Sequence, residues 1–224
     1  MKKTEKNSVE KFYEKLTEEG LAAHAANETQ QEAQLQFLKN HLSKDQKILD
    51  LACGYGRLTI PLAQAGYKVE GIDLVPSLIK KAKELTQEEN LKIKFKIGDI
   101  RDLACKENSF DAVICMWSSF NHLLTQKDQI KSLKEILRVL CEKGIAIIDL
   151  PYFRKPTKEM LQLGEFLDDE NHLFKREFRG VETILFLHSK QSLEKVLKAA
   201  KIETYKIKYV DIGGKRRLVL YLWK

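Results

Sequence analysis

The sequence predicts a single α/β domain in which helices cover both faces of a mostly parallel sheet. Three observations favour this fold class. Residues 48–62 read as a buried strand, a glycine turn and a helix, apolar runs and amphipathic helices then alternate to residue 150, and residues 203–223 read as a hairpin around Gly213 and Gly214. Strands that alternate with helical patterns are typical of β–α–β units, and therefore of parallel pairing.

Apolar periodicity places the individual elements. Residues 8–20 and 28–43 read as two helices before the first strand, so we expect residues 1–44 to form a helical cap over the ligand edge of the sheet. Residues 45–150 make the ligand-binding core, with a helix that begins at Pro76 and another over residues 129–141. The expected strands are residues 48–52, 67–74, 91–97, 109–117, 144–150, 203–210 and 216–223.

The alternation breaks between residues 151 and 188. Pro151 and Pro156 open a charge-rich piece, and residues 171–179 and 181–188 then read as two short strands. We expect this insertion on the substrate side of the active-site edge, because loops on a rigid scaffold carry recognition. Residues 189–224 complete the domain with a helix (189–200) and the hairpin.

Composition sets broad limits on the protein class. The 224 residues suffice for one domain with a full core, and the net charge of +7 is spread along the chain among glutamates, as on a solvated surface. The four cysteines have neither metal-like nor disulfide-framework spacing, so we expect no metal site and a reducing cytoplasmic location. We also expect no signal peptide, and no apolar run approaches the roughly 20 residues of a membrane span.

The glycine turn after the first strand is the most informative stretch. Asp50 ends the apolar run, and Gly54 and Gly56 let the backbone turn tightly against a ligand. A phosphate loop would need Lys-Ser or Lys-Thr after the glycines, where Arg57 stands, and a dinucleotide fingerprint would need a glycine in place of Thr59. A ligand that carries an ammonium or sulfonium group together with a carboxylate suits the acidic residue better.

These residues, DLACGYGR at positions 50–57, resemble the first motif of the class I S-adenosylmethionine-dependent methyltransferases. That motif is usually an acidic residue followed by a glycine-x-glycine-x-glycine loop, and Ala52 departs from it where the first glycine is expected. The resemblance implies a three-layer Rossmann-like fold whose seven-stranded sheet has one antiparallel C-terminal strand. It also implies that S-adenosylmethionine is the cofactor and S-adenosylhomocysteine the product. The cofactor-binding residues expected in this loop are Asp50, Ala52, Cys53, Gly54, Gly56 and Arg57.

Two further aspartates match the family's order. Asp73 ends the second strand, where a carboxylate can accept hydrogen bonds from both ribose hydroxyls, with Leu74 beside it. The alternative is a helix-start carboxylate near Pro76. In the methyltransferases that this chain resembles, the residue at Asp99 accepts from the adenine amine and the next amide, Ile100, donates to the ring; the alternative is a simple Gly-Asp turn.

The end of the fourth strand should face both cofactor and acceptor. We expect Met116 and Trp117 to contact the cofactor and Asn121 to line the acceptor site, and His122 is the best-placed general base. His172 and His188 are weaker candidates, and a lone histidine is more often structural.

Three further residues are expected to line the acceptor site. Tyr13 lies in the cap, with packing in the cap as the alternative, and Arg154 and Arg176 in the insertion are expected anion partners. The alternative for the arginines is surface ion pairing, which contributes little.

The predicted function is therefore methyl transfer from S-adenosylmethionine to nitrogen or oxygen of a small molecule by in-line displacement. The sequence names neither the acceptor nor the oligomeric state, and monomer and homodimer both stay open. An RNA methyltransferase that uses the basic surface stays open, as does a non-catalytic regulatory subunit that binds the cofactor. A nicotinamide oxidoreductase is disfavoured because the third glycine of the fingerprint is absent.

Overall fold

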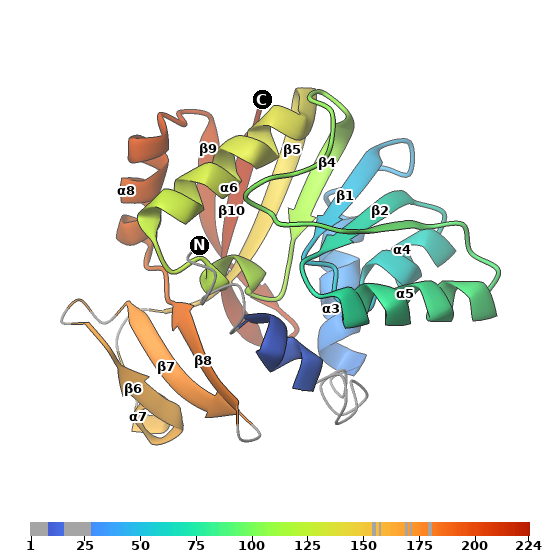
Figure 1. Ribbon diagram of the computed structural model, residues 1–224. Coiled ribbons are helices and arrows are strands. Elements are labelled where there is room, and N and C mark those ends of the chain that lie inside the picture. The colour runs from blue at the N-terminus through green and yellow to red at the C-terminus, as the bar shows by residue number, and fades with distance from the viewer. Residues whose placement is uncertain are drawn as a thin grey trace.

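A computed structural model describes residues 9–15, 28–153, 156, 158–168, 170, 172–178 and 181–224. Its main feature is a seven-stranded sheet in the order β3-β2-β1-β4-β5-β10-β9 (Figure 1). The strands are β1 (Lys47–Leu51), β2 (Lys68–Asp73), β3 (Lys94–Ile97), β4 (Phe110–Cys115), β5 (Leu140–Pro151), β9 (Tyr205–Ile212) and β10 (Lys215–Trp223).

The predicted pairing is confirmed. Strands β3, β2, β1, β4 and β5 pair in parallel, whereas β10 runs antiparallel to both β5 and β9. The tight connection of β9 to β10 uses Gly213 (φ 63°) and Gly214 (φ 74°), a left-handed conformation that side chains disfavour. Because the parallel strands share one direction, their carboxyl ends meet at one edge of the sheet, where ligands bind in such folds.

Helices cover both faces of the sheet, as predicted. They are α3 (Glu28–Lys39), α4 (Thr59–Gln64), α5 (Pro76–Glu88), α6 (Gln126–Val139) and α8 (Lys190–Ala200). Successive residues of β1 face opposite layers: Leu49 packs in the apolar cluster that contains α6 and α8, and Ile48 in the cluster that contains α3 and α4. Helix α5 packs beside α4 through Ile79 and Ile60. In the described part of the chain, no helix is both long and apolar enough to cross a membrane.

The predicted helical cap is only partly right. Helix α3 packs against a face of the sheet, because its apolar stripe of Leu35 and Leu38 meets Ile48 and Leu62. Residues 9–15 are helical, and Tyr13 among them lies at the ligand edge. The remainder of the first predicted helix, residues 16–20, lies outside the described residues.

The insertion forms a small sheet of its own, which projects from the main body beside residues 9–15 (Figure 1). It contains α7 (Lys158–Leu163) and the antiparallel strands β6 (Gly164–Phe166), β7 (Leu173–Phe178) and β8 (Val181–Phe186). Only β7 and β8 were predicted, because three residues give β6 no readable period. Gly164 is required there: a Cβ would lie 2.1 Å from the carbonyl oxygen of Lys175.

Candidate functional site

The carboxyl ends of β1, β2 and β4 border a cavity of about 150 Å³, which we call the central cavity. Most of the residues predicted from the sequence line it: Tyr13, Asp50, Ala52, Cys53, Gly54, Arg57, Asp73, Leu74, Asp99, Ile100, Met116, Trp117 and His122. The structure therefore brings together, at one place, residues drawn from five separate stretches of the chain.

The glycine loop after β1 forms one wall of the central cavity. Gly54 (φ 59°) and Gly56 (φ 86°) are left-handed, and a Cβ on Gly54 would meet nothing within 4 Å, so its backbone faces open space. A Cβ on Gly56 would lie 2.9 Å from the Ile60 side chain, so that glycine shapes the loop instead of lining the cavity. Ala52 is also left-handed (φ 54°), which costs an alanine roughly 1–2 kcal/mol. At Ala52 the backbone thus keeps the left-handed conformation that a glycine, the residue expected at this position of the motif, would adopt without strain.

Asp73 joins the loop after β1 to the start of α5. Its carboxylate accepts from the Gly54 amide (2.8 Å) and from the Val75 amide (2.9 Å). Burial raises the pKa of this carboxyl, and the backbone hydrogen bonds oppose that shift. The alternative role expected for Asp73 was that of a carboxylate at the start of a helix. Its hydrogen bond from the Val75 amide, just before α5, shows that this alternative describes part of its role. The Leu74 amide is a third backbone group that acts on this carboxylate, which has about four lone-pair sites, so some acceptor capacity for ribose hydroxyls remains.

Asp50 supplies the second carboxylate. It is 3% exposed and accepts a hydrogen bond from the Thr59 hydroxyl at 2.6 Å. Burial raises its pKa to about 7, although the Thr59 bond and the Arg57 charge oppose the shift. A cationic ligand group in the central cavity would favour the ionised carboxylate, because an opposite charge stabilises the charged form. The position therefore suits an amino group, as the sequence predicted.

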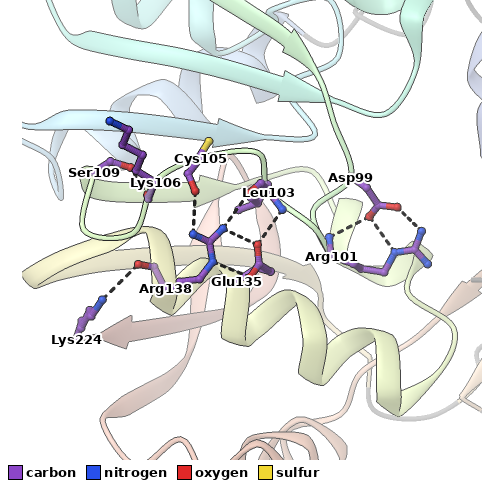
Figure 2. A network of polar contacts seen from close by, with 9 residues as sticks. All are labelled: Asp99, Arg101, Leu103, Cys105, Lys106, Ser109, Glu135, Arg138 and Lys224. Carbon is purple, nitrogen blue, oxygen red and sulfur yellow. Dashed lines mark hydrogen bonds and ion pairs between the residues drawn. The ribbon is translucent and has the colours of Figure 1, made fainter.

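Asp99 is paired within the protein. Figure 2 shows the guanidinium of Arg101 against its carboxylate, with Nε donating to Oδ1 at 2.8 Å and Nη2 bonded to Oδ2. Arg101 also lies 3.4 Å from Asp128. This pairing was not predicted, since nothing in the sequence marks Arg101 as buried. The adenine role of Asp99 stays a prediction, and it now depends on the lone pairs that Arg101 leaves.

A second network holds the segment that follows Asp99 against α6 (Figure 2). Glu135 accepts from the Leu103 amide at 2.8 Å, and Arg138 donates to the carbonyls of Leu103 and Cys105, each at 2.8 Å. Arg138 also donates to Glu135 at 2.7 Å. These contacts satisfy backbone groups of an irregular segment that lies between Asp99 and β4.

The turn after β4 has a strained backbone. Trp117 (φ 61°) and Ser118 (φ 66°) are consecutive left-handed residues without a glycine. The turn is held by Asp149, which is fully buried and accepts from the Trp117 amide at 3.1 Å. Arg217 donates to Asp149 at 2.6 and 3.0 Å and to the Ser118 hydroxyl at 2.7 Å. An ion pair that is buried in the sheet therefore positions the Trp117 turn.

The Asp149–Arg217 pair was missed from the sequence, although a signal was present. Asp149 is the only charge in the apolar run of residues 145–150, and a charge is rarely buried without a partner. The Trp117 side chain, on the turn that this pair holds, makes a further contact: the Arg57 guanidinium lies 4.5 Å from the centre of its ring. This stacking joins the glycine loop to the turn after β4 across the central cavity.

His122 and Tyr13, which both line the central cavity, form a partly buried pair. The Tyr13 hydroxyl lies 3.0 Å from His122 Nε2. Burial and the Arg176 charge lower the pKa of His122 to about 4, and burial raises the pKa of Tyr13. At neutral pH the imidazole is uncharged. Its basicity is far from the neutral range in which a general base works best, so the predicted catalytic role of His122 loses support.

The other predicted acceptor-site residues lie elsewhere. Asn121 is not among the described residues that line the central cavity; its amide donates to the Phe186 carbonyl and attaches the insertion to the 3-10 helix Ser119–His122. Arg176 lies on β7, and Arg154 lies outside the described residues. Sequence reasoning also missed Tyr55 and Leu78, which line the cavity.

The two weaker histidine candidates are structural. His188 is completely buried, and burial lowers its pKa to about 3. His172 stacks on Phe186, and its Nδ1 lies 2.9 Å from the Leu187 carbonyl oxygen. Neither histidine is among the described residues around the central cavity.

Comparison with known proteins agrees with the motif of residues 50–57. Residues 48–144 match the model of the methyltransferase domain family. The chain is 35% identical over 154 residues to the candidate methyltransferase YqeM of Bacillus subtilis (strain 168), which covers 68% of this chain and 62% of that protein. It is 34% identical over 142 residues to the glycine/sarcosine N-methyltransferase of Aphanothece halophytica, which covers 63% of this chain and 52% of the relative. The alignments thus span about half to three-fifths of these relatives' length.

Solved structures share the fold. The PH0226 protein from Pyrococcus horikoshii OT3 superposes with a TM-score of 0.73 at 26% identity, covering 86% of this chain and 89% of that one. An S-adenosylmethionine-dependent methyltransferase from Clostridium acetobutylicum ATCC 824 superposes with a TM-score of 0.68 at 20% identity, covering 94% and 98%. The second likeness is one of fold.

Proposed function

We propose that this chain, which belongs to the class I S-adenosylmethionine-dependent methyltransferases, binds S-adenosylmethionine in the central cavity and methylates nitrogen or oxygen of a small molecule. One observation carries the proposal. The glycine loop and the end of β2 are locked together by the bond from the Gly54 amide to Asp73, and Asp50 lies buried on the same cavity. The Asp50 and Asp73 carboxylates are hydrogen-bond acceptors on either side of an open glycine backbone, and they suit a ligand that has ribose hydroxyls and an ammonium group.

The residues around the central cavity match the parts of the ligand. Asp73 would accept from the ribose hydroxyls, and Asp50 would face the amino group. Asp99 and the Ile100 amide would face the adenine, and Met116 and Trp117 the methionine part. When bound, S-adenosylmethionine supplies a methyl on a cationic sulfur, so an acceptor lone pair can form the new bond while the S–C electrons stay on sulfur and the acceptor proton leaves to water.

The chain's own contribution is orientation and exclusion of water. Arg57 and Trp117, which both line the cavity, stack on each other, and the Asp149–Arg217 pair holds the turn that carries Trp117. The neutral imidazole of His122 lies beside Tyr13 and lines the wall without supplying a strong base. An acceptor that is already a good nucleophile at neutral pH suits this wall best.

A small-molecule acceptor agrees with the relatives. One is named for N-methylation of glycine and sarcosine, and another, from Xanthomonas campestris pv. campestris (strain B100), for O-methylation in ubiquinone biosynthesis at 38% identity over 71 residues. Their names support small acceptors bearing nitrogen or oxygen, and an RNA acceptor has no such support.

Two measurements on one preparation test the proposal. Calorimetric titration should show S-adenosylmethionine and S-adenosylhomocysteine binding with roughly micromolar affinity, about −8 kcal/mol, and no binding of NAD. Labelled-methyl transfer should reach a metabolite extract but not total RNA. Binding of NAD alone would refute the cofactor, label in RNA alone would refute the acceptor class, and binding without any transfer would favour a regulatory subunit.

A further inference from the structure

Two unpartnered nitrogen atoms belong to side chains that act on each other: His122 lines the central cavity, and the charge of Arg176, on β7, acts on His122. His122 Nδ1 and Arg176 Nε are both inaccessible to solvent, and neither has a hydrogen-bond partner among the described residues. Buried polar groups in proteins are normally satisfied, and each one left unsatisfied is costly. Because one of these atoms belongs to a residue on the cavity wall, and the Arg176 charge acts on both Tyr13 and His122 there, the pair points to a ligand that satisfies both atoms.

The Tyr13–His122 contact decides which group His122 presents. The Arg176 charge acts on the Tyr13 hydroxyl, so it favours the orientation in which the phenol oxygen faces the guanidinium and its hydrogen points to His122 Nε2. Nε2 then accepts, and the neutral imidazole carries its hydrogen on Nδ1. His122 Nδ1–H and Arg176 Nε–H are then both donors that lack an acceptor.

The insertion supplies the charge. Arg176 lies on β7, opposite Gly164 and Thr183 on the neighbouring strands, and is partly buried. Burial lowers the pKa of its guanidinium, and in the described part of the chain no acidic residue is among the groups that act on it. Its neighbour Lys175, in contrast, pairs with Glu182 at 2.6 Å and with Glu165 at 3.7 Å. Surface ion pairing was the alternative expected for the insertion's arginines. Among the described residues it is Lys175 that forms such pairs, whereas none is found for Arg176.

We propose that His122 and Arg176 bind a carboxylate of the methyl acceptor, so that the substrate is a small carboxylic acid whose nitrogen or oxygen is methylated. The inference rests on the proposed function. A carboxylate offers only acceptors, which matches two donors, and its planar pair of oxygens matches a guanidinium better than it matches an ammonium. In this arrangement Tyr13 is a positioning residue, and the insertion completes the acceptor site from outside the cofactor-binding core.

The first step of the test is to identify the methylated product. Protein is incubated with labelled S-adenosylmethionine and a metabolite extract, and the labelled product is purified and analysed by mass spectrometry. A product with a free carboxylate agrees with the inference. A neutral product, or a phosphate ester without a carboxylate, overturns the inference and leaves the proposed function standing. Failure to bind S-adenosylmethionine, or binding with no labelled small molecule, overturns both.

The second step tests which residue reads the carboxylate. The acceptor and its primary amide are compared as substrates for the wild type, Arg176→Met, Arg176→Lys and the control Lys175→Met. The wild type should prefer the acid at least about tenfold in kcat/KM, mainly through KM, as hydrogen bonds to charged groups contribute that much. Arg176→Met should lose the preference, Arg176→Lys should keep part of it, and Lys175→Met should match the wild type.

Cofactor affinity separates recognition from misfolding. All variants should bind S-adenosylhomocysteine as the wild type does, because Arg176 lies on the insertion. If Arg176→Met slows the acid and the amide equally, or if the wild type does not discriminate between them, Arg176 does not read the carboxylate and the inference is overturned.

Discussion

The buried ion pair beneath the Trp117 turn provides the sharpest test of how this fold supports its site. Arg217→Met would remove a guanidinium that is 13% exposed and donates twice to Asp149, whose side chain is 0% exposed. Among the described residues, the Asp149 carboxylate would then keep only the Trp117 amide as a hydrogen-bond donor. Leaving a buried charge without its partner costs about 3–5 kcal/mol of unfolding free energy.

That loss converts to a measurable change in melting temperature. For a domain of this size, 1 kcal/mol corresponds to about 2–4 °C, so Arg217→Met should lower Tm by about 6–20 °C. The affinity for S-adenosylhomocysteine should fall as well, because the Trp117 turn loses its support. Arg216→Met is the matched control: this neighbour stacks on Tyr152 and Tyr209 and contributes about 0.5–1 kcal/mol.

A double variant separates a stranded charge from simple loss of packing. Asp149→Leu together with Arg217→Met replaces the pair by apolar groups, which is often neutral for a buried pair. It should recover most of the stability, apart from about 1–3 kcal/mol for the Trp117 amide that loses its acceptor. Urea unfolding of the wild type, both single variants and the double variant gives the coupling. A single variant within 1 kcal/mol of the wild type, or strictly additive losses, would refute the reasoning.

Three further predictions concern the cofactor side of the cavity. The pKa of Asp50 rises from 3.8 to about 7 on folding, so the folded state binds more protons between about pH 4 and pH 7 and stability should fall as pH rises through that window. Asp50→Asn should flatten this slope in urea titrations at several pH values, and equal slopes would contradict the assignment. Ala52→Gly should stabilise the fold by up to about 1 kcal/mol. The variant relieves roughly 1–2 kcal/mol of backbone strain at φ 54°, which exceeds the entropic cost of glycine's greater freedom in the unfolded chain. A less stable variant would show that the loop is not strained there. Asp73→Asn should weaken S-adenosylhomocysteine binding at least about tenfold in calorimetry, because charge-assisted bonds to the ligand are lost. Unchanged affinity would restrict Asp73 to its bonds with the Gly54 and Val75 amides.

Local patterns were sufficient for the cofactor half of the molecule. Strand ends, glycine turns and acidic residues at set positions are properties of contiguous stretches, and parallel pairing then brings them to one edge. Asp50, Gly54 and Asp73 could therefore be predicted, and the structure places them on one cavity. The antiparallel last strand was also predictable, because the Gly213–Gly214 turn allows only a reversal of the chain.

Contacts between distant segments were beyond local patterns. Arg217 meets Asp149 because β10 pairs antiparallel with β5, and that register places Val219 opposite Asp149. Arg101 reads as one basic residue among many until the turn folds it onto Asp99. The helix of residues 28–43 carried the apolar stripe of a packed helix, but its position on a sheet face instead of the ligand edge depends on which apolar surface it meets.

The sequence by itself determined the fold class, the mostly parallel pairing of the sheet and the glycine-loop and strand-end residues that meet on the central cavity, because each depends on short-range pattern and on the shared direction of parallel strands. Only the tertiary structure decided the chemistry around His122. There, burial makes His122 a weak base, Tyr13 orients its ring, and the insertion brings the Arg176 charge beside it. These properties arise from exclusion of water and from electrostatic interactions between residues that are far apart in the sequence. Tyr13 and His122, for example, are more than a hundred positions apart. No local pattern of residues encodes such contacts.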